Sequence, residues 1–375
     1  MTQSTRPSAS QTGAAISQRP DFRPEVLSAA IRVAGVVYAI AYALGCSTGP
    51  RGPASEQDAA ASAGASAQRQ PGASGGSLGC PDCCADGFVR EQERGEATLV
   101  ALVRPSASYV AVCPDGDLYL TRDGIDDIYR IPQVGEPGPF VSLAGMYPGG
   151  MACDEQQRFF VATFGLRPEL NIFDRAGLVL VENSESRPRM LPPPIGGEKL
   201  VTPNGVTLGP HSDLYFTDTA GEMVVLVRET APGTFESRVV ASGVPGAVGV
   251  AYDPMAQRLY VGQATPGGKI VSFAVGDDGS LSDRQVAWST SEGVLPAAMA
   301  IDEHGRVYVS DYFHGPVVSF PGGNTVATVP QPSGLAFRGG KLLVTDYYIA
   351  EPALEGGLYE VPLGVCGADI RAARR

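Results

Sequence analysis

The stretch VTPNGVTLGPHSDLYFTDTAG, residues 201–221, decides the fold, because it reads as two short strands joined by a turn. The first strand covers 204–208, and the second covers 213–217 and ends at Asp218. The residues between them, Gly-Pro-His-Ser at 209–212, are typical of turns, so the two strands should pair as a β-hairpin. The chain repeats this hairpin, and the repeat carries the prediction of the fold.

Similar hairpins recur at intervals of about 35 to 55 residues, which is the range of propeller blades. The paired strands are expected at 108–113 and 118–122, 149–153 and 158–163, 204–208 and 213–217, 248–252 and 258–262, 297–301 and 306–310, and 333–337 and 341–345. Third strands are expected at 128–131, 170–173, 224–227, 270–273, 317–320 and 358–361. Fourth strands are expected at 140–143, 178–181, 238–241, 285–288 and 325–329, and the sixth blade has none.

The segment 98–103, TLVALV, reads as a strand without a blade of its own. If it becomes the outer strand of the sixth blade, it covers the exposed edge and closes the ring. The sequence therefore predicts an all-β, six-bladed β-propeller with four-stranded blades over 97–366, followed by a C-terminal tail at 367–375.

Composition supports this fold class and excludes one class of partner. The 375 residues include 47 Gly and 31 Pro, and the strand-like runs are short, which favours a propeller, barrel or sandwich. The net charge is −12, with 28 Lys and Arg against 40 Asp and Glu. Because such a surface repels phosphate groups, we expect no nucleic-acid partner.

The first 46 residues read as a secretory signal. Four arginines precede 33–45, VAGVVYAIAYALG, an apolar run too short to span a bilayer comfortably. The end of this run, Ala-Leu-Gly-Cys at 43–46, resembles a bacterial lipobox with Ala43 in place of the usual Leu, so lipidation is expected at Cys46. A non-cleaved anchor is the alternative. The lead is long and contains Asp21 and Glu25, which leaves the true start codon open.

Residues 47–96 read as a tether that carries a cysteine cluster. The part before residue 80 is almost entirely Ser, Ala, Gly, Gln and Pro, a composition that cannot bury a core. Without Cys46, six cysteines remain, an even number suited to disulfides outside the cytoplasm: Cys80, Cys83, Cys84, Cys113, Cys153 and Cys366. The cluster at 80–84, CPDCC, lacks the His of a haem site and has no second ligand group for zinc. A disulfide clamp onto the propeller is favoured, with Cys366 as one candidate partner, and the pairing stays open.

Three stretches resemble the gluconolactonase and senescence-marker-protein (regucalcin) family of six-bladed propellers. They are 202–206 (TPNGV) with 214–218 (LYFTD), 296–302 (PAAMAID) with 305–309 (GRVYV), and 356–365 (GGLYEVPLGV). The resemblance covers about residues 98–366 and implies a calcium or zinc ion on the central axis. Asn204 matches the family's Asn ligand, but the family's Glu and Asp ligands fall at Ser108 and Ala297, and its second-blade Asn falls at Gly149. Because calcium prefers about six to eight oxygens, several of them anionic, the implied site is depleted.

Other carboxylates are candidates to replace the missing ligands. Four aspartates close second strands at the rim that Asn204 occupies, namely Asp123, Asp218, Asp311 and Asp346, and Asp126, Asp127 and Glu351 lie on longer rim segments. Asp218 and Asp311 are the preferred candidates for a site, although such residues commonly accept backbone N–H bonds in turns. His314 is the one histidine placed to act as a base, because His211 and His304 fall in turns at the opposite rim.

Two functions follow. The favoured one is a lipid-anchored or secreted monomeric propeller of the cell envelope, periplasmic or at the outer surface. It would bind a small molecule or an envelope protein without catalysis and would touch the membrane only through its lipid. The aromatic residues at 312–313 and 347–348 suit a sugar-like or apolar ring ligand, although they suit packing between blades equally well. The alternative is a calcium- or zinc-dependent lactonase or related ester hydrolase that uses Asn204 and substitute carboxylates.

Overall fold

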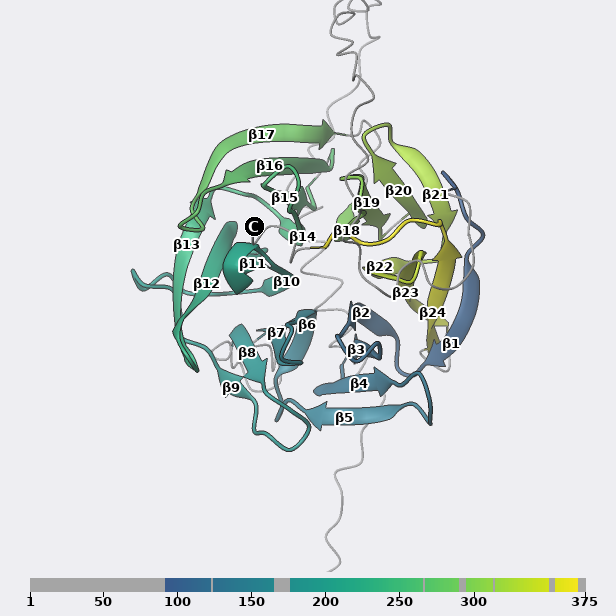
Figure 1. Cartoon of the computed structure of the whole chain (residues 1–375), viewed down its shortest axis with the longest axis horizontal. Coiled ribbons are helices and arrows are strands. Elements are labelled where there is room, and N and C mark those ends of the chain that lie inside the picture. The colour runs from purple at the N-terminus through teal and green to yellow at the C-terminus, as the bar shows by residue number, and fades with distance from the viewer. Residues whose placement is uncertain are drawn as a thin grey trace, which may run out of the picture.

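The structure, a computed structural model, describes residues 92–122, 124–164, 176–265, 267–289, 295–312, 314–350 and 355–369. Within these residues the strands form six four-stranded antiparallel sheets, arranged as blades around a common axis (Figure 1). The predicted six-bladed propeller is confirmed. The predicted signal, Cys46 and the cluster Cys80, Cys83 and Cys84 lie outside the described residues, so their assignments stay predictions.

Each blade runs from an inner to an outer strand. Blade one contains β2 (Ala107–Val112), β3 (Leu118–Arg122), β4 (Asp127–Ile131) and β5 (Gly138–Ser142). Blade two contains β6 (Tyr147–Cys153), β7 (Phe159–Phe164), β8 (Gly177–Val181) and β9 (Arg189–Met190). Blade three contains β10 (Pro203–Leu208), β11 (Leu214–Asp218), β12 (Met223–Ala231) and β13 (Thr234–Ser242), with a short 3-10 turn, Pro210–Ser212, between the first two.

Blade four contains β14 (Ala247–Asp253), β15 (Arg258–Gln263), β16 (Lys269–Val275) and β17 (Leu281–Ser289). Blade five contains β18 (Pro296–Ile301), β19 (Val307–Asp311), β20 (Pro316–Phe320) and β21 (Asn324–Thr328). Blade six contains β22 (Pro332–Arg338), β23 (Lys341–Ala350) and β24 (Glu355–Pro362), and its outer strand is β1 (Thr98–Val103).

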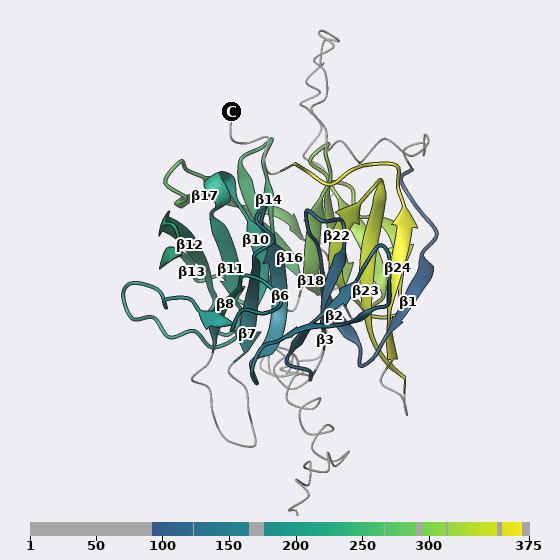
Figure 2. The same cartoon turned by 60° about the horizontal axis from the view of Figure 1, so that its bottom comes forward.

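The ring closes as the sequence predicts. β1 pairs antiparallel with β24, so a strand from the start of the described chain completes the last blade, and Figure 2 shows the two strands side by side. Upstream of β1, the Gln92 amide donates to Leu363 O at 2.9 Å and the Gly95 amide donates to Val326 O at 3.0 Å. Closure by both ends of the chain removes one exposed sheet edge and links the first and last blades.

The C-terminal segment adds a second contact on blade five, where β18 turns into β19. Gly367 forms an antiparallel bridge with Asp302, and the Ala368 amide donates to Ile301 O at 2.8 Å. Cys366 is buried there, and its amide donates to Glu303 Oε1 at 3.0 Å. Residues 366–368 therefore lie along the extension of β18.

Blade two differs from the prediction. The segment 178–181 was expected as a fourth strand, but β8 pairs directly with β7 and is therefore the third strand. The fourth strand is the two-residue β9, which the sequence pattern does not reveal. The expected third strand at 170–173 lies outside the described residues. The error arises because an apolar run such as GLVLV fits either the third or the fourth strand of a blade, and only strand pairing distinguishes them.

Hydrophobic faces of neighbouring blades form the core. Alternate residues of each strand point to opposite faces of its sheet, so each blade packs on both of its neighbours. Phe160 of β7 and Phe216 of β11 share one such layer with Phe235 of β13, and the rings of Phe160 and Phe235 lie 5.9 Å apart. Equivalent layers fill the other boundaries between blades.

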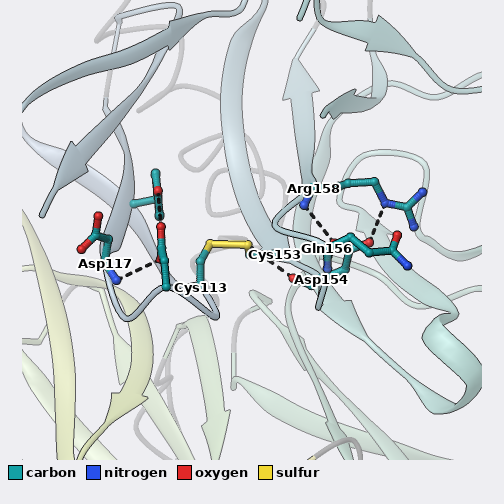
Figure 3. The surroundings of a disulfide bond; sticks show 8 residues. Cys113, Asp117, Cys153, Asp154, Gln156 and Arg158 are labelled. Carbon is teal, nitrogen blue, oxygen red and sulfur yellow. Dashed lines mark hydrogen bonds and ion pairs between the residues drawn. A yellow bond between two sulfur atoms is a disulfide. The ribbon is translucent and has the colours of Figure 1, made fainter. Parts of the chain in front are cut away.

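A disulfide and an ion pair strengthen the lower rim, the side on which inner strands turn into second strands. Cys113 and Cys153, at the lower ends of β2 and β6, form a disulfide between blades one and two with their Cα atoms 5.5 Å apart (Figure 3). In the next turn, Asp154 accepts backbone N–H bonds from Gln156 and Arg158 and pairs with the Arg158 side chain at 2.7 Å (Figure 3).

Candidate functional site

Strand register identifies one axial position in each inner strand. Every inner strand has a bulge near its upper end, at which its pairing with the second strand shifts by one residue. The residues equivalent to Asn204 at this bulge are Ser108, Gly149, Val248, Ala297 and Ser333. Of the ligand positions that the resemblance implies, Ser108, Gly149, Asn204 and Ala297 thus fall on one ring around the axis.

The next residue of each inner strand is small, because the inner strands nearly touch. A Cβ on Gly205 would lie 2.4 Å from Val248 O, one on Gly150 2.5 Å from Asn204 O, and one on Gly334 2.7 Å from Tyr109 Cα. Gly249 and Ala298 occupy this position in blades four and five. Blade one is the exception, because the residue there is Tyr109.

Tyr109 crosses the axis. Its hydroxyl donates to Asn204 Oδ1 of blade three and lies 3.4 Å from Ala297 O of blade five. Asn204 is buried, and its amide nitrogen Nδ2 donates to Thr219 Oγ1 at 3.2 Å. Thr219 Oγ1 in turn donates to Ala247 O of blade four at 2.7 Å. The upper end of the axis therefore holds a continuous neutral hydrogen-bond chain through four blades.

This donor set does not fit the calcium or zinc ion that the resemblance implies. The six axial positions, all of which the structure describes, hold no carboxylate, and Asn204 Oδ1 already accepts a hydrogen bond from Tyr109. Calcium requires several anionic oxygens, and catalytic zinc requires about three nitrogen, sulfur or carboxylate ligands. Across the described parts of the chain, no group of three or more His, Cys, Asp or Glu residues is arranged to hold a metal ion.

The rim aspartates hold the loops that lead into their own blades. Asp218 is fully buried, and its two oxygens accept N–H bonds from Val201 at 2.7 Å, Thr202 at 2.9 Å and Gly221 at 2.9 Å. Asp311, in the same register position, accepts the Leu295 amide at 3.2 Å.

Asp346 repeats this arrangement in blade six, where it accepts the Gln331 amide at 3.1 Å. Burial raises the pKa of the neighbouring Tyr359, and the Asp346 carboxylate raises it further. The candidate Asp123 lies outside the described residues, as does Glu351. Asp126 accepts the Gly145 amide at 2.5 Å, and Asp127 pairs with Arg122.

Blade five adds an imidazole to its aspartate. His314 Nδ1 lies 2.7 Å from Asp311 Oδ2, and the His314 side chain is 56% exposed whereas that of Asp311 is 1% exposed. Because a carboxylate only accepts, Nδ1 is the donor in this contact, and in the neutral imidazole Nε2 is then an acceptor. In blade three the equivalent interaction is the backbone bond from Gly221 to Asp218. His314 is thus an oriented side chain at the upper rim.

Two aromatic rings follow the rim aspartates of blades five and six and contact each other. Tyr312, directly after Asp311, and Tyr347, directly after Asp346, have ring centroids 5.5 Å apart at an angle of 57°. Both side chains are half-buried. His211 and His304 lie in lower-rim turns, as expected, and so on the far side of the disc from this group. The upper rim over blades five and six therefore combines an aromatic pair with a held imidazole.

Sequence reasoning placed Asn204 and His314 at the upper rim but missed Tyr109. The signal was present, because Tyr109 stands where the other inner strands have Gly or Ala. It also missed the hydroxyl residue of the second strand that precedes the register position of Asp218. Thr217 Oγ1 accepts the Gly205 amide at 2.9 Å and donates to Val248 O at 2.6 Å, and so links its own hairpin to the next blade. Thr121 and Thr345 make the same bond to the next blade.

Comparisons with solved structures find the same architecture. A gluconolactonase from Xanthomonas campestris is 19% identical with a TM-score of 0.55, over 69% of this chain and 86% of that one. A second protein, solved as a candidate gluconolactonase, is 17% identical with a TM-score of 0.58, over 73% and 94%. The aldose sugar dehydrogenase of Streptomyces coelicolor, in its PQQ-bound form, is 18% identical with a TM-score of 0.51, over 73% and 99%.

No protein-family profile and no curated protein matches the sequence. Within the described part of the chain, no helix reaches the length and hydrophobicity that a membrane crossing requires. Likeness at these identities concerns the fold alone, since propellers of one architecture carry different activities. The predicted resemblance is confirmed at that level: the chain folds as a six-bladed propeller of the kind found in gluconolactonases.

Proposed function

We propose that this chain is a ligand-binding propeller that receives a small, sugar-like ring molecule at the upper rim of blades five and six and does not hydrolyse it. The observation that carries the proposal is the group formed by Tyr312, Tyr347 and the Asp311-held His314. Aromatic faces pack against the C–H face of a sugar ring, and an oriented imidazole nitrogen accepts a hydrogen bond from a hydroxyl of the sugar. These are the contacts that a neutral polyhydroxylated ring needs.

The axis supports binding over metal-dependent hydrolysis. A lactonase of the ion-dependent type polarises the substrate carbonyl on the metal and activates a water molecule there. Here the axial positions supply one amide oxygen, and the Tyr109 hydroxyl already donates to it. Asp218, a preferred sequence candidate for a substitute ligand, already accepts hydrogen bonds from three backbone amides.

The second candidate function is a metal-dependent lactonase or related ester hydrolase, and Asn204 is the residue that favours it. The solved neighbours include a gluconolactonase, so glucono-1,5-lactone is the appropriate probe for both functions. In this alternative, an ion supplied in solution would displace Tyr109 from Asn204. Asp311, which contacts the exposed His314 side chain, would be the substitute carboxylate.

The same experiment distinguishes the two functions. The full chain is titrated with glucose and with glucono-1,5-lactone by calorimetry, and lactone hydrolysis is followed with and without millimolar calcium. We expect saturable binding that falls about tenfold in Tyr347→Ala and in His314→Ala, a loss of 1.4 kcal/mol each. His211→Ala, an exposed histidine of the lower rim, is the matched control and should bind like the parent.

Two results would contradict the proposal. If neither glucose nor glucono-1,5-lactone binds saturably, the proposal of a sugar-like ligand is wrong. Calcium-dependent hydrolysis above the spontaneous rate, abolished by Asn204→Ala, would establish the lactonase instead.

We further propose that the propeller is displayed on the cell envelope through a lipid on Cys46. The lipobox-like segment before this cysteine and the Ser/Ala/Gly-rich stretch after it support this placement. A Cys46→Ser variant should leave the membrane fraction and appear as soluble monomer, and its continued presence in membranes would argue for the non-cleaved anchor. An envelope protein bound by the same rim would be recovered from cross-linked cells with the parent and not with Tyr347→Ala.

A further inference from the structure

The position of Tyr109 sets blade one apart from the other five. At the register position of Tyr109 the other inner strands carry Gly150, Gly205, Gly249, Ala298 and Gly334. For most of these, the contacts of a built Cβ explain the small residue: it would lie 2.4–3.2 Å from backbone atoms of the neighbouring inner strand. A tyrosine at this position must send its ring away from the neighbouring strand. The hydrogen bonds of its hydroxyl show that the ring reaches across the axis.

The Tyr109 hydroxyl contacts two oxygen atoms of other blades. The first is the buried Oδ1 of Asn204 in blade three. The second is Ala297 O in blade five, at 3.4 Å. Asn204 Nδ2 continues the chain to Thr219, whose hydroxyl donates to Ala247 O at 2.7 Å. The side-chain polar atoms of Tyr109, Asn204 and Thr219 each therefore have a hydrogen-bond partner in this chain of contacts.

Four of the six boundaries between blades carry a hydroxyl latch, and the Tyr109 contact with Ala297 lies at one of the two boundaries without one, since Ala162 of blade two and Gly262 of blade four have no hydroxyl. In four blades a second-strand hydroxyl donates to the carbonyl of the next blade's axial residue: Thr121 to Gly149, Thr217 to Val248, Ser310 to Ser333 and Thr345 to Ser108. In blade four the equivalent residue is Gly262, whose absent Cβ would lie 2.6 Å from Pro296 Cβ. Gly262 has no hydroxyl to offer the next axial carbonyl, Ala297 O. The Tyr109 hydroxyl approaches that carbonyl from across the axis.

We infer that Tyr109 and Asn204 form a metal-free lock at the centre of the propeller, which takes the place that the resemblance assigns to an ion. The lock links blades one and three directly, blade four through Thr219, and blade five through Ala297. The inference is independent of the proposed ligand site, which lies on different residues. Because Asn204 Oδ1 already accepts a hydrogen bond and no axial position carries a carboxylate, we expect the locked axis to bind neither calcium nor zinc.

Thermal unfolding of the full chain tests the lock. Tyr109→Phe keeps the ring and removes only the hydroxyl, which leaves the buried Asn204 Oδ1 without its donor. We expect the melting temperature to fall by about 2–4 °C. The matched control is Tyr260→Phe. Tyr260 is a half-buried tyrosine of β15 whose hydroxyl has no hydrogen-bond partner in the described part of the chain, so this variant should melt with the parent.

A double-mutant cycle shows whether the two residues act as one unit. If they do, Tyr109→Phe should lower the melting temperature less once Asn204→Ala is present, because only the longer contact of the hydroxyl with Ala297 O is then left to lose. Additive shifts in melting temperature would overturn the lock. This readout also holds if Asn204→Ala lowers stability strongly, because it depends on the difference between the variants.

Metal titration supplies the second arm. Neither millimolar calcium or zinc nor EDTA should change the melting temperature of the parent. Heat of metal binding that Asn204→Ala leaves unchanged would come from a site away from the axis and is compatible with the lock. Stoichiometric binding that Asn204→Ala abolishes would place an ion on the axis and overturn the inference.

Discussion

Asp218 tests whether a rim carboxylate serves the fold or the site. Its side chain has no exposed surface, and its oxygens accept three backbone N–H groups at 2.7–2.9 Å. Asp218→Asn keeps the shape and one oxygen but presents an NH2 group to the amide that the other oxygen accepted. One charge-assisted bond is lost and one buried N–H has no acceptor, at a cost of about 2–4 kcal/mol. At about 2–4 °C per kcal/mol, we expect Tm to fall by about 5–15 °C.

Circular dichroism on heating and urea unfolding measure this change. Asp277→Asn, an exposed aspartate in the turn after β16, is the matched control and should alter stability by less than about 0.5 kcal/mol. Ligand affinity of the folded Asp218→Asn protein should equal that of the parent. An unchanged Tm together with a large loss of ligand affinity would refute the structural role and return Asp218 to the site.

Three further predictions follow from contacts between and within blades. Thr217→Val removes a hydroxyl that is both donor and acceptor between two inner strands, and it should cost about 2–3 kcal/mol in urea unfolding, whereas Thr217→Ser should restore most of it. Cys113→Ser should lower stability by about 4 kcal/mol, because the disulfide to Cys153 closes a loop with a sequence separation of 40, and adding reductant should then destabilise the parent more than the variant. The pKa of Glu229 is lowered because the Arg158 guanidinium donates to it, so its contribution to stability is present above its ordinary pKa of 4.5 and is lost as pH falls through the lowered value. Glu229→Gln should therefore reduce the loss of unfolding free energy between about pH 6 and pH 3.5, and an unchanged pH profile would contradict this assignment.

Much of the fold was predictable because its signals are local. A hairpin such as 201–221 shows its turn residues and its alternating strands within about twenty residues, and six such hairpins define the blades. The spare strand at 98–103 follows from counting, since a sheet with an exposed edge needs a partner. Blade two shows the limit, because 178–181 has the composition of any inner strand and its place depended on pairing with β7.

The candidate site was less predictable because it depends on pairs that are distant in sequence. Asn204 and His314 could be placed at the upper rim from strand direction alone. Strand direction could not predict that a tyrosine hydroxyl faces Asn204 Oδ1, since Tyr109 lies 95 residues away in the sequence. Sequence spacing equally left the partner of Cys113 open, and the structure joins it to Cys153.

The sequence by itself determined the strands, the turns and the number of blades, because hydrogen bonding within a hairpin depends on neighbouring residues. Only the tertiary structure decided what occupies the centre. Ring closure brings six inner strands to one axis, and Tyr109 then meets Asn204 and Ala297 across separations of 95 and 188 residues. Which polar groups find partners there is set by the geometry of the closed ring, and no single stretch of chain contains that information.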